Sequence, residues 1–466
     1  MSTIAHSHAH GHAHAPAHAP AHAHAEPPGA EDLFPLDDLG HEARRLLAFG
    51  RAAALPGGGF AWLDVTGAPT PGMPAYLYVT GRMTHTYALA HLLGVPGAAE
   101  LVDHGVNSLR TVFHDDAHGG WFTAVEAGGA ADGLDGGADS TGHVVVDDRK
   151  WSYPHAFVIL AAASAHLAGR PGAAELLDEA LAVVEERFWD EGLGVVVEEW
   201  DASFTRLSDY RGANANMHTV EAFLAAFDAT GRAVWLDRAR QISERVVGVA
   251  EAHQWRLPEH YDAGFHPLLE HNREHLTDPF KPYGATVGHG FEWSRLLLQV
   301  DAGLHAAWDG DHGAADPMGS EPGTASTPSG RVDLVGAARA LFDRAVADGW
   351  SVDGAPGFVY TTDWSGTPVI RQRLHWVVCE ALGAAAALWH VTGEEAYAGH
   401  YRTWWEYART TFVDTLGGSW HHELDPVNRP AATIRPGKAD IYHATQAMLL
   451  PGLPLRPSMA GALVAG

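Results

Sequence analysis

The chain alternates between two kinds of helical pattern. One kind is rich in alanine, leucine and aromatic residues on every side, as in YPHAFVILAAASAHLAG. The other carries a charged face, as in AAELLDEALAVVEERF. A helix that is apolar all round is buried, whereas an amphipathic helix covers a core from outside. The alternation therefore predicts inner helices that are each followed by an outer helix.

This pair of patterns recurs along the chain. Inner patterns begin near residues 81, 153, 216, 288 and 373, and YHATQAMLL supplies a sixth, which HEARRLLAFGRAAAL from the N-terminal part completes. An aromatic turn with Asp and Gly follows each complete pair, starting at Phe113, Phe188, Trp255, Trp350 and Phe412. These turns resemble short β-hairpins and are 62 to 75 residues apart once a 22-residue insertion is subtracted. Regular repeats of this length predict one closed all-α domain over residues 31–466, in which an outer ring of helices surrounds an inner ring.

Two stretches fall outside this scheme. Residues 1–30 are a His/Ala/Pro-rich tail with too few large apolar groups to fold, so we expect disorder, with incidental metal binding by its histidines left open. Residues 309–330 interrupt a helical region and are predicted to be a surface insertion.

Composition excludes several function classes. The 466-residue chain has a net charge of −27 with only 30 basic residues, which argues against binding nucleic acid or an anionic membrane. Its single cysteine, Cys379, lies in an apolar run and is predicted to be a buried thiol. No signal peptide and no stretch of about 18 uncharged apolar residues is found. We therefore expect a cytoplasmic protein, and a homo-oligomer stays open.

Polar residues gather where the inner helices begin. They are Arg82, Tyr153, Asn214, His218, His289, Glu292, Arg373, His375, Trp376 and His443. Because all inner helices enter the ring in the same sense, these residues should line one pocket, which six positive helix ends face. Such a pocket suits a polyhydroxyl ligand or an enediolate that forms during a reaction.

The stretch GHGFEW carries the strongest candidate chemistry. Glu292 lies three residues after His289, hence on the same helix face, where it could fix the tautomer of the imidazole. Trp376 could stack on a sugar ring, and Glu380, one turn later, would offer hydrogen bonds to sugar hydroxyls.

Six motifs together resemble the N-acylglucosamine 2-epimerase superfamily, in particular its mannose isomerase and sulfoquinovose isomerase branch. They are RMTHTYALAH, KWSYPHAFVILAAA, NANMHTVEAFLAA, GHGFEWSRLLL, HWVVCEALGAA and GKADIYHATQA. The resemblance implies an (α/α)6 barrel that isomerises or epimerises a monosaccharide without a metal or another cofactor. It assigns acid/base roles to His289 and His443. It assigns substrate contacts to Arg82, Tyr153, Asn214, His218, Glu292, Trp376 and Glu380.

The function predicted in this way is an aldose–ketose isomerase of the D-mannose/D-fructose or sulfoquinovose type, which works through a cis-enediol. Four alternatives stay open at this point. They are a sugar 2-epimerase, an inverting glycoside hydrolase with Glu292 and Glu380 as its carboxylates, a metal-dependent isomerase, and a sugar-binding barrel without activity.

Overall fold

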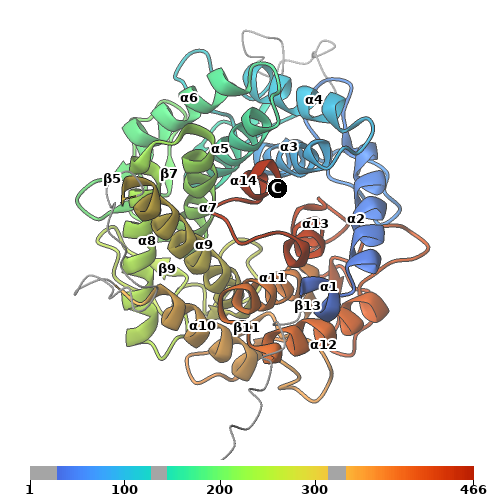
Figure 1. Ribbon diagram of the computed structural model, residues 1–466. Coiled ribbons are helices and arrows are strands. Elements are labelled where there is room, and N and C mark those ends of the chain that lie inside the picture. Colours follow the sequence, from blue (N-terminus) through green and yellow to red (C-terminus); the bar gives the residue numbers. More distant parts are fainter. Residues whose placement is uncertain (1–28, 127–143, 313–331, 466) are drawn as a thin grey trace, which may run out of the picture.

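Two concentric rings of helices make up the protein (Figure 1). The computed structural model describes residues 29–126, 144–312 and 332–465. Residues 1–28 of the predicted tail and residues 313–330 of the predicted insertion lie outside the described residues. Helix α9 runs on to His312, four residues into the segment that we predicted to be an insertion.

The inner ring is formed by α3 (Leu77–Leu92), α5 (Ser152–Leu167), α7 (Ala213–Thr230), α9 (Val287–His312), α11 (His375–Thr392) and α13 (Tyr442–Leu449). The outer ring is formed by α4 (Ala98–Thr111), α6 (Ala173–Val183), α8 (Ala233–Ala252), α10 (Leu334–Gly349), α12 (Glu395–Thr411) and α2 (Leu36–Gly50). Each inner helix packs on the next, and α13 contacts both α3 and α2, which closes the ring. The predicted all-α (α/α)6 barrel is confirmed, including the joining of the two chain ends.

Small residues allow the inner helices to pack closely. Nearly every residue of α3, α5, α7 and α11 is buried. A β-carbon at Gly81 would lie 2.7 Å from the backbone oxygen of Phe157. The contact between α3 and α5 therefore depends on the missing side chain at position 81.

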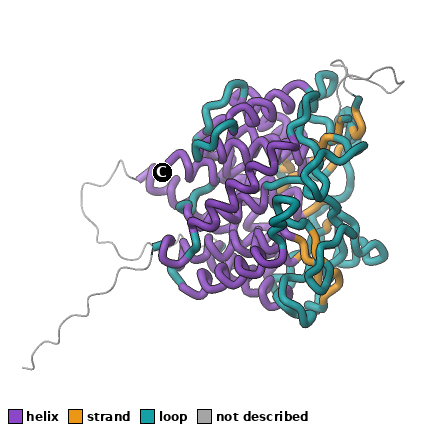
Figure 2. Tube along the Cα trace, turned by 90° about the vertical axis from the view of Figure 1, so that its right-hand side faces the viewer, coloured by secondary structure: helices purple, strands orange, loops and turns teal. Residues whose placement is uncertain are grey.

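Short strands and long loops gather at one end of the ring (Figure 2). A two-residue strand leads into five of the inner helices, and each pairs antiparallel with a strand that follows the outer helix of the same pair. The pairs are β1 (Ala75–Tyr76) with β2 (Ala124–Val125), β4 (Lys150–Trp151) with β7 (Glu199–Trp200), β8 (Arg211–Gly212) with β9 (His260–Tyr261), β10 (Ala285–Thr286) with β11 (Thr361–Thr362), and β13 (Arg373–Leu374) with β14 (Glu423–Leu424). Four further strands complete the small sheets: β3 (Val145–Asp147), β5 (Trp189–Asp190) paired with β6 (Val195–Val196), and β12 (Pro368–Ile370).

Each of these five pairs also fixes the start of its inner helix. The first helical N–H donates to the carbonyl of the residue just before the second strand of the pair. The five carbonyls belong to Thr123, Glu198, Glu259, Tyr360 and His422. The residues in this repeated position are therefore held directly beside the helix N-termini.

Four of the five predicted aromatic turns close locally as expected. They are the bridges His114 to Trp121, Trp350 to Phe358 and Val413 to Trp420, and the β5–β6 pair. The turn at Trp255–Gly264 differs, because no bridge closes it among the described residues; Tyr261, at its end, bridges forward to Pro267 instead.

The C-terminal segment fills the other end of the ring. After α13 the chain forms a short turn, η3 (Leu450–Gly452), and then α14 (Met459–Ala465), which contacts α3, α5 and α7 (Figure 1). Ser458 anchors this helix by donating from its N–H and its hydroxyl to Asp228 at 2.9 and 2.6 Å. The Arg456 carbonyl also accepts a hydrogen bond of 3.3 Å from Gln299 of α9.

Two predictions about composition can be compared with the structure. Cys379 is a free, buried thiol whose pKa is raised by burial, as expected for a core residue. None of the helices in the described part of the chain has the length and apolar character that a membrane span requires.

Candidate active site

A pocket opens at the end of the ring where the inner helices begin. Its empty space, counted together with the open mouth, is ≈ 850 Å³, which lies in the range of sites that enclose small molecules. Eight of the nine residues predicted from the sequence line it, and they come from all six inner helices. They are Arg82, Tyr153, Asn214, His218, His289, Glu292, Trp376 and His443. Residues up to 361 positions apart are thus brought to one cavity.

His443 and His289 have matching surroundings. The Nδ1 atom of His443 lies 2.7 Å from Glu380 Oε1, and the Nδ1 atom of His289 lies 2.8 Å from Glu259 Oε2. Since a carboxylate accepts, each Nδ1 carries a proton and each Nε2 keeps its lone pair. Burial lowers the pKa of His443 well below its usual range, and the charge of Arg82 adds to this effect.

Trp376 lies beside both of these histidines. Its ring centroid is 5.2 Å from that of His289 and 5.9 Å from that of His443. The two imidazoles therefore border the same indole and line the same pocket. An aromatic face of this kind can receive the apolar side of a sugar ring.

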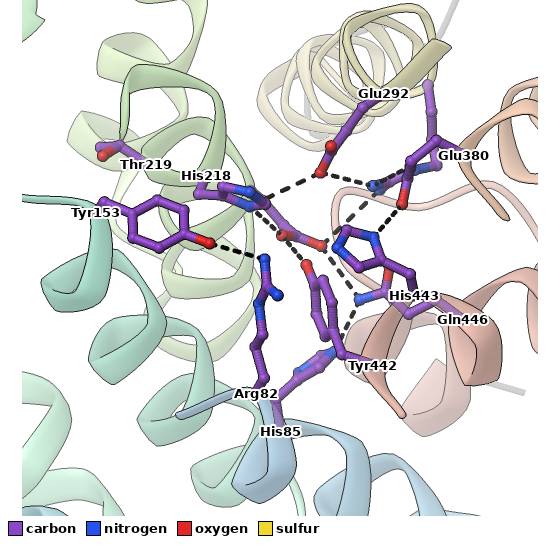
Figure 3. A network of polar contacts seen from close by, with 12 residues as sticks. Arg82, His85, Tyr153, His218, Thr219, Glu292, Glu380, Tyr442, His443 and Gln446 are labelled. Atoms are coloured by element: carbon purple, nitrogen blue, oxygen red, sulfur yellow. Dashed lines mark hydrogen bonds and ion pairs between the residues drawn. The ribbon is translucent and has the colours of Figure 1, made fainter. Parts of the chain in front are cut away.

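Glu292 does not orient His289, contrary to our expectation. Its Oε1 atom lies 3.7 Å from His218 Nδ1 and 3.7 Å from Arg295 Nη2 (Figure 3). The spacing of three residues places both side chains on one helix face, but Glu259, from a neighbouring loop, binds His289 instead. Burial and the nearby charge of Glu380 raise the pKa of Glu292 well above its usual range, which favours the protonated form of this carboxyl group.

Glu380 is placed differently from our expectation as well. It does not line the pocket but lies behind it, where it bridges His443 and the Nε and Nη2 atoms of Arg295 at 3.2 and 3.1 Å (Figure 3). Both of its oxygens are occupied in this way. Glu380 therefore supports His443 rather than offering hydrogen bonds to a ligand.

A buried arginine contacts the acidic side chains of the site. Arg295 is 1% exposed and is surrounded by three carboxylates, those of Glu221, Glu292 and Glu380. Burial alone would raise the pKa of Glu221, but the polar contact with His218 and the charge of Arg295 outweigh burial and lower it. The pKa values of Glu292 and Glu380 are raised instead, so negative charge in this cluster is favoured on Glu221.

His218 extends the same cluster to the pocket wall. Its Nδ1 atom is 3.5 Å from Glu221 Oε2, and burial lowers the pKa of His218 to about 4. The ring is neutral at neutral pH and packs against Phe157 and Tyr153, with ring centroids 4.7 and 5.3 Å away. It can therefore exchange hydrogen bonds with a ligand but carries no charge.

Arg82 is already paired. It donates to Asp440 Oδ2 at 3.1 Å and to the Tyr153 hydroxyl at 3.0 Å. The rings of Tyr78, Tyr153, Phe157 and Tyr442 surround its guanidinium at 4.5 to 5.9 Å. Asp440 balances the charge of Arg82. The pocket is therefore less electropositive than we expected from the sequence.

Two groups of three side chains could reach a common metal ion. They are His218, Glu221 and Glu292, and also Glu292, Glu380 and His443, with ligand atoms within 4.8 Å of one another in each group. Arg295 already contributes a cation to both groups through Glu221, Glu292 and Glu380. A divalent ion would have to compete with this guanidinium at close range.

We expect that removal of divalent metals leaves the activity unchanged. The reason is that Arg295 already provides the positive charge that the carboxylates need. Initial rates would be compared before and after dialysis against EDTA, with zinc, magnesium or manganese added back. A chain in which the tail histidines are replaced by alanine serves as the control, because the tail could bind metal on its own. Loss of activity that one metal restores in both chains would contradict this expectation.

Sequence reasoning missed much of the pocket wall. His375 lines the pocket as predicted, whereas Arg373 pairs with Asp353 instead. The additional lining residues are Trp62, Tyr78, Tyr210, Glu259, His260, Pro279, Phe280, Pro282, Tyr360, His422, Arg435, Ala439 and Asp440. Three of them, Glu259, Tyr360 and His422, occupy the repeated position before the second strand. Aligning the repeats on the turns as well as on the helices would have found these three. Asp440 belongs to the motif GKADIYH, in which only His443 was predicted to be a site residue.

Comparison with known proteins gives consistent results. The family model described as N-acylglucosamine 2-epimerase (GlcNAc 2-epimerase) matches residues 58–314 and 323–447. The D-mannose isomerase of Thermobifida fusca is 51% identical over 427 residues, which cover 91% of this chain and 96% of that protein. The D-mannose isomerase of Pseudomonas cannabina pv. alisalensis is 45% identical over 427 residues, 91% of this chain and 94% of that protein. A crystal structure of a D-mannose isomerase superposes with a TM-score of 0.75 at 25% identity, covering 89% of this chain and 97% of that one.

Proposed function

The chain belongs to the N-acylglucosamine 2-epimerase family, and we propose that it is an aldose–ketose isomerase that interconverts D-mannose and D-fructose. One observation carries this proposal. Two imidazoles, each with Nδ1 bound to a carboxylate, border one indole in a sugar-sized pocket. Two such groups can move protons on opposite flanks of one monosaccharide.

The reaction needs a base and an acid that exchange roles. Ring opening takes a proton from the anomeric hydroxyl and gives one to the ring oxygen. An imidazole Nε2 then takes the C2 proton, an enediolate forms, the proton on O2 moves to O1, and a proton returned at C1 gives the ketose. His443 is suited to the role of base because its lowered pKa leaves Nε2 unprotonated at neutral pH.

Charge that develops on the substrate oxygens also has partners. The raised pKa of Glu292 favours its protonated form, which can donate a hydrogen bond to the oxygen at C1 or C2. The Arg82 guanidinium, fixed by Asp440, can donate from the other side. We assign both residues to stabilisation of the enediolate, with Asn214 and His218 contacting other hydroxyls.

Competing functions receive less support. In an inverting hydrolase the two carboxyl groups lie about 6.5–9.5 Å apart, but oxygens of Glu292 and Glu380 come within 4.8 Å. Sulfoquinovose would need a cation for its sulfonate; Asp440 balances the charge of Arg82, which leaves Arg435 as the pocket cation that would have to bind it. A 2-epimerase uses the same enediolate and differs only in where the proton returns.

We also propose a cytoplasmic location, for which the single buried cysteine is the support.

Proton NMR in D2O distinguishes these possibilities. D-mannose, D-lyxose, D-glucose and sulfoquinovose would each be incubated with the protein. We expect D-mannose to give D-fructose with deuterium at C1, and deuterium at C2 of the mannose that forms on reversal. D-glucose as the main product from D-mannose would favour the epimerase, and turnover of sulfoquinovose alone would refute mannose as the substrate.

Glu259→Gln is expected to lower kcat by roughly 10-fold or more with little change in KM, because the amide can also present N–H to His289 and stabilise the wrong tautomer. Steady-state rates on D-mannose measure this effect. Glu198→Gln is the matched control, since Glu198 occupies the same repeated position but accepts from the Gly212 N–H at 2.9 Å. Equal kcat values for the two variants would refute a role of Glu259 in positioning His289.

A further inference from the structure

One further histidine of the pocket has a ring nitrogen without a partner. His375 is the first residue of α11, lines the pocket and is only 6% exposed. Its Nε2 atom is buried and has no hydrogen-bond partner in the described part of the chain. An unpaired buried nitrogen is costly, so its presence in a ligand pocket points to a partner that arrives with the ligand.

The backbone of His422 defines which nitrogen of His375 carries the proton. The His422 carbonyl accepts from the backbone N–H of His375 at 3.1 Å and lies 3.4 Å from its Nδ1. A carbonyl oxygen can only accept, so Nδ1 is the protonated nitrogen and Nε2 has the lone pair. The ring nitrogen without a partner is therefore an acceptor.

Stacking holds the ring in this orientation. The imidazoles of His375 and His422 lie face to face, with centroids 3.8 Å apart and planes 14° from parallel. Burial lowers the pKa of His375 to about 4, while Asp440 opposes this shift and Arg435 and Arg82 add to it. The ring is neutral at neutral pH and remains an acceptor.

His375 differs from the two histidines to which we assign proton transfer. His289 and His443 each have a carboxylate at Nδ1 that would stabilise an imidazolium, whereas His375 has only a carbonyl. Its ring lies at 85° to that of His443 with centroids 6.4 Å apart. It is therefore built to bind next to the reacting atoms and not to carry a proton.

We propose that Nε2 of His375 accepts a hydrogen bond from one specific hydroxyl of the bound monosaccharide, on the His443 side of the pocket, and so helps to select the sugar. This inference rests on the proposed function and adds a specificity-determining residue to it. A site built to accept from a hydroxyl discriminates against analogues that lack it, because the acceptor is then left buried and unpaired.

The test combines a variant with a set of deoxy sugars. His375→Phe keeps a ring that can stack on His422 but removes the acceptor. We expect kcat/KM for D-mannose to fall by about 3- to 30-fold, mainly through KM. The intact protein should lose a similar factor on one of 3-deoxy-, 4-deoxy- and 6-deoxy-D-mannose, and His375→Phe should lose nothing further on that sugar.

Two more variants separate binding from structure. His375→Gln, which retains an acceptor oxygen, should recover part of the loss. His390→Phe is the matched control, because His390 lies at the far end of the same helix, outside the pocket, and its buried Nε2 atom also has no partner. It should leave kcat/KM unchanged. The inference would be overturned if kcat/KM of His375→Phe on D-mannose equals that of the intact protein. It would also be overturned if His375→Phe further lowers kcat/KM on every one of the deoxy sugars.

Failure of the proposed function gives a different result. If the intact protein converts no aldose, calorimetric titration with the unreactive polyol D-mannitol still compares the intact protein with His375→Phe. A Kd raised by the variant then supports the hydrogen bond without isomerase activity. Equal Kd values would overturn it.

Discussion

His443→Ala is expected to lower kcat for the conversion of D-mannose to D-fructose by at least about 10²-fold. The variant removes the imidazole whose Nδ1 is fixed by Glu380, which is in turn fixed by Arg295. No other base in the pocket has this arrangement at the same place. Deuterium uptake from D2O into the sugar, measured together with product formation, should fall by the same factor.

The pH profile gives an independent check on His443. A base must be unprotonated to accept the C2 proton, so activity rises as pH rises through its pKa. Since burial lowers the pKa of His443 well below 6.5, we expect kcat/KM to stay high at pH 6 and to decline only at lower pH. A decline centred above pH 6.5 would contradict this assignment.

A structural histidine provides the control for this variant. His155 of α5 is also buried, but it lies outside the pocket and is bonded to the carbonyl of Trp151 and the N–H of Trp121. His155→Ala should lower the melting temperature while kcat per folded molecule stays near that of the intact protein. If His443→Ala keeps nearly full activity in folded protein, His443 is not the base.

His289→Ala is expected to have a loss of similar size, again at least about 10²-fold in kcat. This change removes the second imidazole that contacts Trp376. It also leaves the Glu259 carboxylate without its histidine partner. Because both histidines serve one reaction, the double variant should be little slower than either single variant. Additive losses would indicate two independent roles.

D-glyceraldehyde separates ring opening from proton transfer at C2, since it cannot close a sugar ring. The variant whose deficit becomes smaller on this compound has lost the residue that opens the ring. Equal deficits would assign both residues to the C2 and C1 protons. His104→Ala, whose imidazole bonds the Gly59 carbonyl away from the pocket, is the control for removal of a partly buried histidine.

The fold was predictable because the helix pattern repeats. Burial on every side of one helix and on one face of the next sets the two rings, and this contrast is visible in the Ala-rich run of α5 and the charged face of α6. Closure of the ring through α2 and α13 was predictable as well, because the pattern of α13 begins a sixth helix pair that the pattern of α2 completes. The turn before Gly264 was predicted less well, because the local bridge there joins Tyr261 to Pro267, beyond the predicted turn.

The site was predictable at the helix N-termini and much less so between them. Spacing within a helix located His289 and Glu292 correctly but could not choose the partner of His289, since Glu259 lies 30 residues away on a loop. Spacing likewise placed Glu380 one turn from Trp376, yet the approach of Arg295 from α9 decides where its carboxylate lies. Contacts between helices, rather than positions along one helix, determine these roles.

The C-terminal helix has a consequence for how catalysis must proceed. Because α14 packs against three inner helices at the far end, the barrel is a cup and not a tunnel. Ketose must therefore leave by the opening through which aldose arrives. Since both sugars occupy the same cavity in turn, the ketose should inhibit competitively against the aldose.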